Sequence, residues 1–253
     1  MMKKHTLALA MLTLMSFGAA QAQTHFSLRL GGAFPTGKFA DASANYNNEN
    51  LNWGLSDNSK KGGAGIGFTV GGQLKFDISS IKGMGVIASA DFMYNILCSD
   101  INYYYDEMVD DLDNNNTEFS ITKPQYINIP VMVGLGYTYE ATQNLGLFVE
   151  AGLGANIRMI TNEVYNTYII SSQRETINTY EYNTNVTFAY RVGAGLLFGG
   201  KYTLGVDYFS LGTAKVECTG YTEVNGVEGN NPTKYKLGKI TPTILTLRFG
   251  INF

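Results

Sequence analysis

Apolar and polar residues alternate along much of this chain, and the alternation is clearest at its end. Between positions 243 and 253 the odd positions carry Thr, Leu, Leu, Phe, Ile and Phe, whereas the even positions include Arg248 and Gly250. A repeat of two is the repeat of a β-strand, whose successive side chains point to opposite faces. An apolar face that runs to the last residue, opposite an arginine, suits a wall between lipid and a polar lumen.

Seven more segments alternate in the same way, and each is long enough to cross a membrane as a tilted strand of roughly 9–11 residues. With the last segment they make an even number, as in bacterial membrane barrels. Pro130 has no amide hydrogen and therefore predicts a bulge or an unpaired position within its strand. The predicted strands span residues 25–34, 64–76, 86–96, 126–137, 145–159, 186–198, 202–211 and 241–253.

The connections between these segments alternate between short and long. Short turns are centred near Ser79, Ala141 and Gly199. Because bacterial barrels have short periplasmic turns and longer outer loops, the pattern predicts an all-β protein. We expect an eight-stranded antiparallel up-and-down transmembrane β-barrel with both termini on the periplasmic side. Its four long extracellular loops would be residues 35–61, 99–123, 161–185 and 212–239.

The aromatic residues indicate which face meets lipid. Alternation alone would also fit a soluble barrel with an apolar interior. Aromatic side chains, however, gather at both ends of the apolar faces, as in the two girdles of a membrane barrel. Those at the short-turn end are Phe26, Phe76, Tyr137, Phe198, Tyr202 and Phe253, and those nearer the long loops are Phe34, Phe92, Tyr94, Phe188, Tyr190 and Tyr208.

The opposite face combines glycine with charged residues. An eight-stranded barrel is just wide enough to be filled by side chains, and buried charges need partners. We therefore expect ion pairs along a side-chain-filled lumen, with an ion-selective pore as the alternative. The predicted lumen charges are Arg29, Lys75, Asp91, Glu150, Arg158, Arg191, Asp207 and Arg248.

The amino terminus has the features of a cleaved signal peptide. Lys3 and Lys4 precede an apolar stretch at 7–17 and an Ala-Gln-Ala cleavage site at 20–22. This predicts a signal peptide at 1–22 and one barrel domain at 23–253. Without the two lysines, 16 basic residues remain against 21 acidic ones, a net charge of −5 that makes nucleic acid an unsuitable partner.

Two motifs carry a resemblance to a known family. The segments Y-I-N-I-P-V-M-V-G-L-G-Y at 126–137 and L-R-F-G-I-N-F at 247–253, with the signal peptide and eight strands, resemble the small outer-membrane β-barrel, or porin-family, proteins of Gram-negative bacteria. Eight-stranded OmpA-like and OmpX-like barrels are of this type. The resemblance implies export to the cell outer membrane, surrounding outer-membrane lipid, and an assembly signal for the outer-membrane insertion machinery at Phe249, Ile251 and Phe253.

Catalytic chemistry finds little support in the sequence. The chain has two histidines; His5 belongs to the signal peptide, and His25 has no evident serine–carboxylate partner. Ion pairing explains Asp91 and Asp207 more simply than catalysis. We therefore expect no enzymatic activity, no catalytic residues and no cofactor.

The second long loop contains the densest acidic run of the chain, from Asp100 to Glu118. Asp111, Asp113 and Asn115 match the first oxygen ligands of a calcium loop, but its expected glycine and glutamate are missing. We expect a solvated acidic loop without a metal site, and weak divalent-cation binding remains an open hypothesis.

The two cysteines, Cys98 and Cys218, leave a disulfide open, since the periplasmic route permits one. The alternative is a packed Cys98 and an unpaired Cys218 in a loop.

Tyrosine and asparagine are frequent in the long loops, which would either bind an extracellular or outer-membrane protein or continue the strands as a polar β-rich rim. The sequence therefore favours a structural or interaction scaffold. A small-solute porin and a component of a secretion or assembly complex are the alternatives.

Overall fold

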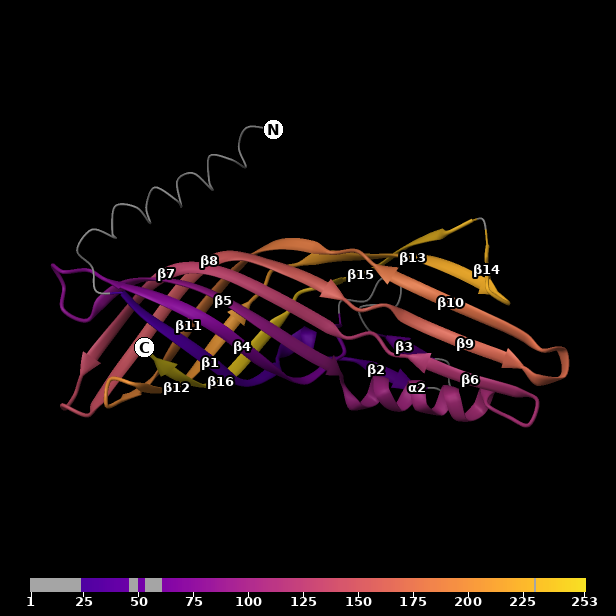
Figure 1. The fold of residues 1–253 in the computed structure, drawn as a ribbon, viewed down its shortest axis with the longest axis horizontal. Coiled ribbons are helices and arrows are strands. Elements are labelled where there is room, and N and C mark those ends of the chain that lie inside the picture. Colours follow the sequence, from indigo (N-terminus) through magenta and orange to yellow (C-terminus); the bar gives the residue numbers. More distant parts are fainter. Residues whose placement is uncertain (1–23, 46–49, 53–60, 230) are drawn as a thin grey trace, which may run out of the picture.

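The computed structural model describes residues 24–45, 50–52, 61–229 and 231–253. The expected signal peptide, its cleavage site and the mature start at Gln23 lie outside the described residues. The molecule is elongated, with a barrel at one end and an extension at the other, and the carboxyl terminus lies at the barrel end (Figure 1).

The eight predicted strands form a closed antiparallel barrel, which confirms the predicted fold class. Its strand order is β1-β16-β12-β11-β8-β7-β5-β4, and β4 pairs with β1 to close it. The observed strands are β1 (Thr24–Pro35), β4 (Ala64–Asp77), β5 (Met84–Leu97), β7 (Tyr126–Glu140), β8 (Leu145–Ile160), β11 (Asn185–Phe198), β12 (Tyr202–Ser210) and β16 (Thr243–Asn252).

Pro130 interrupts one ladder without displacing it. The β5–β7 pairing passes from Ala90 opposite Val131 to Met93 opposite Asn128 in one register, whereas β8 pairs with Pro130 directly through Asn156. The proline therefore creates the unpaired position that the sequence allowed, and not a bulge.

The apolar faces of the barrel strands point outward. Leu30 and Leu153, for example, are 61% and 57% exposed, whereas Thr69 and Asn128 on the opposite faces are buried. This excludes a soluble barrel with an apolar interior and confirms the orientation predicted from the aromatic girdles. At the short β11–β12 turn, Gly199 and Gly200 take φ values of +56° and +71°, which L side chains rarely adopt.

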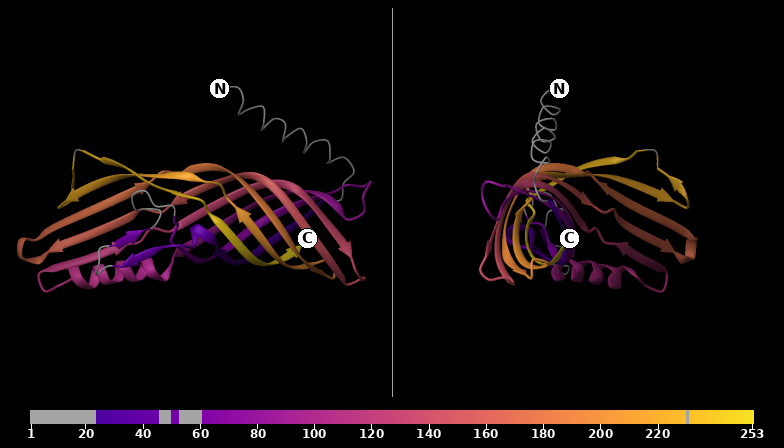
Figure 2. Two further views of the ribbon diagram at one scale, coloured as in Figure 1. Left: turned by 180° about the vertical axis from the view of Figure 1, so that it is seen from behind. Right: turned by 60° about the vertical axis from the view of Figure 1, so that its left-hand side comes forward.

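Six strands continue beyond the barrel as a second sheet. Figure 2 shows long strands passing from the barrel into this extension, with a helix beside it. A β-rich rim was therefore a correct interpretation of the third and fourth loops. The strands are β6 (Thr117–Thr122), β9 (Glu163–Ile169), β10 (Arg174–Tyr182), β13 (Ala214–Val224), β14 (Val227–Glu228) and β15 (Thr233–Ile240).

The acidic segment is a helix, so the prediction of a solvated loop was wrong there. Helix α2 (Ser99–Leu112) buries Ile101 and Tyr105 and lies against β6 and β2 (Ser43–Asn45), which pairs antiparallel with β3 (Asn50–Asn52). Two 3-10 turns, η1 (Gly37–Phe39) and η3 (Ile170–Ser172), complete the described elements. Among the described residues, no helix is long and apolar enough to cross a membrane.

The main hydrophobic core lies at the junction of barrel and extension. It combines Phe209 and Ile244 of the barrel with Ile101 and Tyr105 of α2. Cys98 packs partly buried against this core, as one of the two alternatives had it, but Cys218 is buried in strand β13 and not in a loop. Both cysteines are free thiols.

Candidate functional site

The barrel lumen begins, at the short-turn end, with an open cavity of about 740 Å³. Lys75 and Asp77 line it, and their side chains approach to 3.4 Å. Its inner wall includes Arg29 and Glu150. Because short turns mark the periplasmic side, this vestibule opens toward the periplasm.

A compact ion-pair network fills the lumen beyond the vestibule. Arg191, fully buried, lies 2.7 Å from Glu150, and Arg248 lies 2.7 Å from Asp91 and 2.5 Å from Asp207. Six of the eight predicted lumen charges meet here, three positive and three negative: Arg29, Arg191, Arg248, Asp91, Asp207 and Glu150. Opposite charges taken from water together offset much of their desolvation cost.

The other two predicted charges face the lumen but do not join this network. Lys75 sits in the vestibule, where its ammonium donates to the Gly83 carbonyl at 3.1 Å. Arg158 lies buried on the far side of the barrel and donates to the Ile240 carbonyl at 3.0 Å. Among the described residues, no carboxylate forms a salt bridge with Arg158.

Glycine makes the network possible. A Cβ on Gly71 would come within 2.1 Å of the Asp91 carboxylate, and one on Gly193 within 2.2 Å of the Asp207 carboxylate. Phe209 covers the network on its outer side, with the Arg191 and Arg248 guanidinium carbons 5.9 Å and 5.5 Å from its ring centre.

Beyond the network, apolar side chains share the lumen with buried Asn128, Asn156 and Arg158, and the sequence did not predict these apolar positions. Met93, Met132 and Ile244 are buried there on strand faces that were expected to be polar. Their burial in the lumen was not expected, because charged residues nearer the periplasm made the same strand faces look polar along their whole length.

The first loop closes the outer mouth of the barrel. Phe39 of η1 is fully buried and packs edge-on against Tyr126, with ring centres 5.1 Å apart. The Tyr126 hydroxyl donates to the Gly62 carbonyl, and the Gly62 amide donates to the Lys38 carbonyl at 2.7 Å. The two ends of the loop therefore hold Phe39 across the lumen.

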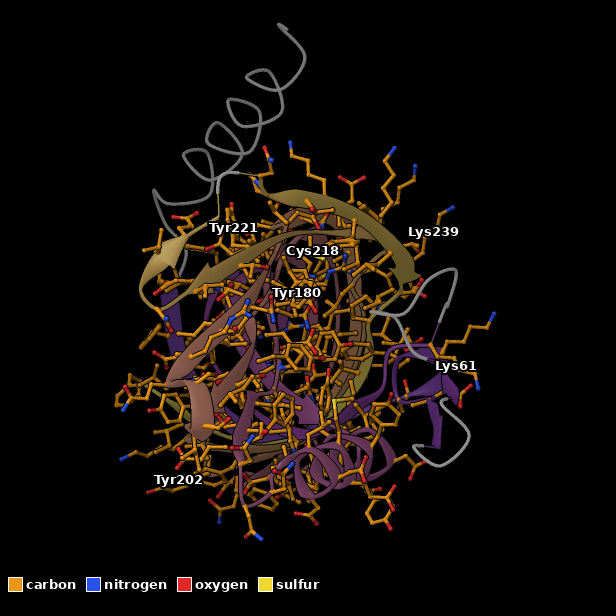
Figure 3. The ribbon with its side chains drawn as sticks, turned by 90° about the vertical axis from the view of Figure 1, so that its right-hand side faces the viewer. Lys61, Tyr180, Tyr202, Cys218, Tyr221 and Lys239 are labelled. Carbon is orange, nitrogen blue, oxygen red and sulfur yellow. The ribbon has the colours of Figure 1, made fainter. Side chains whose placement is uncertain are left out.

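A buried carboxylate organises the extension. The Tyr165 and Tyr182 hydroxyls each donate to Glu163 at 2.5 Å, and the Tyr105 hydroxyl of α2 donates to it as well. Desolvation first, and then Glu163, raise the pKa values of these phenols well above their usual range. Desolvation also raises the pKa of the nearby Cys218 thiol to about 11. Figure 3 looks onto this region, where Tyr180 lies enclosed by strands and α2.

The remaining candidate groups are not arranged around a common centre. His25 Nε2 lies 3.1 Å from Asp77 at the vestibule rim. Asp111 belongs to the last turn of α2, and Asp113 accepts a bond from the Phe119 amide at 3.3 Å. Within the described ranges, no His, Cys, Asp and Glu side chains gather in a group that could hold a metal ion.

A closed eight-stranded barrel with an apolar outer surface and a charged interior defines an integral outer-membrane protein. The chain belongs to the outer membrane protein beta-barrel domain family, whose model matches residues 7–253. Its location is therefore the outer membrane, as predicted.

Comparison with curated proteins finds no match. Among solved structures, OprG from Pseudomonas aeruginosa is 14% identical with a TM-score of 0.43, over 92% of this chain and 97% of OprG. Neisserial surface protein A is 9% identical with a TM-score of 0.38, over 92% and 99% of the two chains. Ail of Yersinia pestis is 11% identical with a TM-score of 0.35, over 91% and 99%.

Proposed function

We propose that this protein is a non-conducting outer-membrane scaffold that holds a folded binding platform above the cell surface. The observation that carries the proposal is the filling of the lumen in successive layers. The vestibule ends at the ion-pair network, Phe209 covers the network, and Phe39 closes the mouth.

An ion passing through the lumen would have to displace the buried ion pairs. Arg191, Asp91, Asp207 and Arg248 are each at most 3% exposed and bonded to one another. Breaking one partner away from a buried pair costs about 3–5 kcal/mol. Passage would also require Phe209 and Phe39 to leave packed positions, so solute flow through this lumen is strongly opposed.

The extension supports the second half of the proposal. It is a sheet braced by α2 and by the Glu163 hydroxyl cluster, and it exposes large side chains. Tyr103 is 64% exposed, Val227 70% and Tyr235 41%. Rigid, exposed tyrosines provide amphipathic contact area at low entropic cost, which suits binding to an extracellular or outer-membrane protein. The proposal assigns no enzymatic activity.

Planar-bilayer conductance tests the closed lumen. The reconstituted wild-type protein should leave the membrane silent at voltages and salt concentrations at which a general porin gives steps. Reproducible single-channel steps from folded protein would overturn the proposal.

One observation favours a second candidate, a small-solute channel: the vestibule already reaches Arg29 from the periplasmic side. Uptake of small solutes by proteoliposomes would support this alternative. Recovery of a stable outer-membrane complex in pull-downs would instead support service in a secretion or assembly complex.

A further inference from the structure

Strands β13 and β15 of the extension carry an unusual concentration of lysine. Lys215 lies on β13, and Lys234, Lys236 and Lys239 lie on β15, all of them exposed. None of these four lysines forms a salt bridge with a described residue. Their concentration does not follow from composition, because the chain as a whole has a net charge of −3.

Two of these lysines stand directly opposite each other. Lys215 pairs with Lys239, and after a register shift Glu217 pairs with Lys236 and, two residues further, Thr219 with Lys234. Like charges directly opposite on neighbouring strands repel each other and destabilise the pair. A bound anion between them would remove that repulsion, so the pair indicates an anionic partner.

The lysine pair lies just beyond the outer end of the lipid-facing pairs of β12 and β16, at the start of the β13–β15 pairing. On the barrel, β12 and β16 present the outward pairs Leu204 with Phe249 and Val206 with Leu247. Beyond them come hydroxyl residues: Ser210 is opposite Thr243, and the Thr213 and Thr241 hydroxyls lie 2.6 Å apart. The lysine pair follows. This succession of apolar, hydroxyl and cationic pairs matches the order of hydrocarbon, interface and charged headgroups in a leaflet.

The neighbouring strand fixes the height of the pair. Tyr190 of β11 is opposite Ser210 of β12. Beyond this ladder a Cβ on Gly212 would lie 2.4 Å from the Phe188 carbonyl oxygen, and the Asn183 amide donates to the Glu217 carbonyl at 3.0 Å, so residues 184–187 run beside residues 213–216. Phe188 and Val186 are 65% and 69% exposed, so the apolar surface reaches the level of Lys215. The lysine therefore stands at the edge of the lipid-facing band.

The lysine side of the extension also carries exposed Glu217, opposite Lys236, whereas the acidic residues of α2 lie elsewhere. Figure 3 shows Lys239 pointing away from the sheet, with α2 and its acidic residues on a different side of the molecule. A lysine beside an apolar surface can lay its carbon chain along that surface and keep its ammonium among headgroups.

We propose that Lys215 and Lys239, with Lys236 and Lys234 above them, form a binding site for the phosphate groups of outer-leaflet lipids. The site would anchor one side of the extension to the membrane surface. We choose a lipid over a soluble polyanion because the lysine pair comes directly after the lipid-facing pairs of β12 and β16 and beside exposed Phe188 and Val186.

The test uses the full mature protein in nanodiscs of three compositions. One contains zwitterionic phosphatidylcholine alone, one adds a phosphorylated outer-membrane glycolipid, and one adds the same glycolipid after dephosphorylation. Amine acylation read by mass spectrometry should show protection of Lys215 and Lys239 only with the phosphorylated lipid. Protection should weaken as salt is raised, because exposed charges are screened. Equal acylation in all three compositions would overturn the proposal.

A double variant measures how much the two lysines contribute to the affinity for the lipid. Lys215→Gln with Lys239→Gln should lower the affinity for phosphorylated glycolipid, measured by native mass spectrometry, by roughly 25-fold at low salt, since each lysine near an anionic surface contributes about a factor of five. The matched control, Lys82→Gln with Lys201→Gln, removes the same charge near the short turns and should leave the affinity unchanged. Circular dichroism establishes that both variants are folded.

A third arm separates lipid from soluble anions. A sulfated oligosaccharide and inorganic phosphate are offered to the protein in phosphatidylcholine nanodiscs. Weak binding of both supports the lipid site. If the soluble oligosaccharide instead binds as tightly as the glycolipid, the site recognises polyanions in solution and the lipid assignment is wrong.

Discussion

Gly193 leaves the space that the Asp207 carboxylate occupies, and this single residue shows how tightly the lumen is packed. The sequence indicated that glycine beside long charged side chains would mean a narrow interior. The structure gives the reason, since a Cβ at this position would lie 2.2 Å from Asp207 Oδ1. Glycine is required at position 193 because it has no side chain, and not because of its conformational freedom.

Gly193→Ala should therefore lower stability by about 1–3 kcal/mol, the usual cost of overpacking a close-packed interior. The measurement is the urea midpoint of unfolding in detergent micelles, followed by circular dichroism. Gly72→Ala serves as the control, because a Cβ there would meet its nearest atom, on the Phe26 ring, at 3.4 Å. Equal midpoints for the two variants would contradict the packing argument.

The Glu163 cluster makes a prediction about alkaline pH. Burial raises the pKa values of Tyr105, Tyr165 and Tyr182, so these phenols keep their protons in the folded protein when unfolded tyrosines ionise near pH 10. Their stabilising contribution is complete below pH 10 and is lost as pH rises above it.

Absorbance at 295 nm should show at least these three of the 17 tyrosines un-ionised until the extension unfolds. Tyr182→Phe should reduce the dependence of stability on alkaline pH. Ionisation of every tyrosine in one step, with the fold intact, would refute this account.

Among the elements, the terminal strand β16 was predicted from the sequence and helix α2 was not. β16 was predicted from period-two alternation alone, and its lumen and lipid faces were both assigned correctly. Helix α2 was missed because its apolar residues are embedded in an acidic run. Ile101, Tyr105, Met108 and Leu112, spaced by four, three and four residues, are the helical signal that would have identified it.

The assembly signal at the end of β16 remains a prediction. The Phe253 ring stacks on Phe26 at 6.1 Å, and its amide donates to the Phe26 carbonyl at 2.8 Å, so it also completes barrel closure. Deleting Phe253 should lower the amount of folded protein in the outer membrane several-fold, measured by membrane fractionation. Phe188→Ala, at an exposed aromatic in the opposite girdle, should leave that amount nearly unchanged. Wild-type levels after deletion would argue against an assembly role.

The attachment of α2 gives a further prediction. Tyr105→Phe removes one hydroxyl donor to Glu163 and should loosen the helix by about 1–2 kcal/mol. Limited proteolysis within residues 99–123 should become roughly ten-fold faster while the barrel stays resistant. Tyr103→Phe changes an exposed tyrosine of the same helix and should cleave like wild type. Unaltered cleavage in Tyr105→Phe would mean that the cluster does not hold α2.

At the scale of the molecule, the proposed closed lumen rests on two separate groups of side chains, Phe39 at the mouth and the six-charge network below it. Phe39→Ala removes the apolar closure but leaves the six-charge network in place. Bilayers containing this variant should therefore stay silent, although its thermal midpoint should fall because Phe→Ala in a core costs about 3–5 kcal/mol. Conductance appearing in Phe39→Ala alone would show that the charge network does not seal the barrel.

The sequence by itself determined the barrel strands, because each face of such a strand stays in the same environment from one end to the other. Each barrel strand has one face in lipid and one in the lumen, so its pattern repeats every two residues and predicts a strand, and the aromatic girdles then indicate which face meets lipid. The lumen charges could be named for the same reason, since a charged side chain on a lipid-facing strand can only point inward.

Only the tertiary structure decided which of those charges meet and what closes the barrel. Arg158 and Arg191 occupy equivalent positions in the alternation, but only Arg191 reaches the carboxylates. Phe39 and Glu163 come from loop segments with no regular repeat, and their roles arise from Tyr126 and Tyr105, distant in sequence. Pairing across a barrel depends on the height of each residue along the axis, which no local pattern contains.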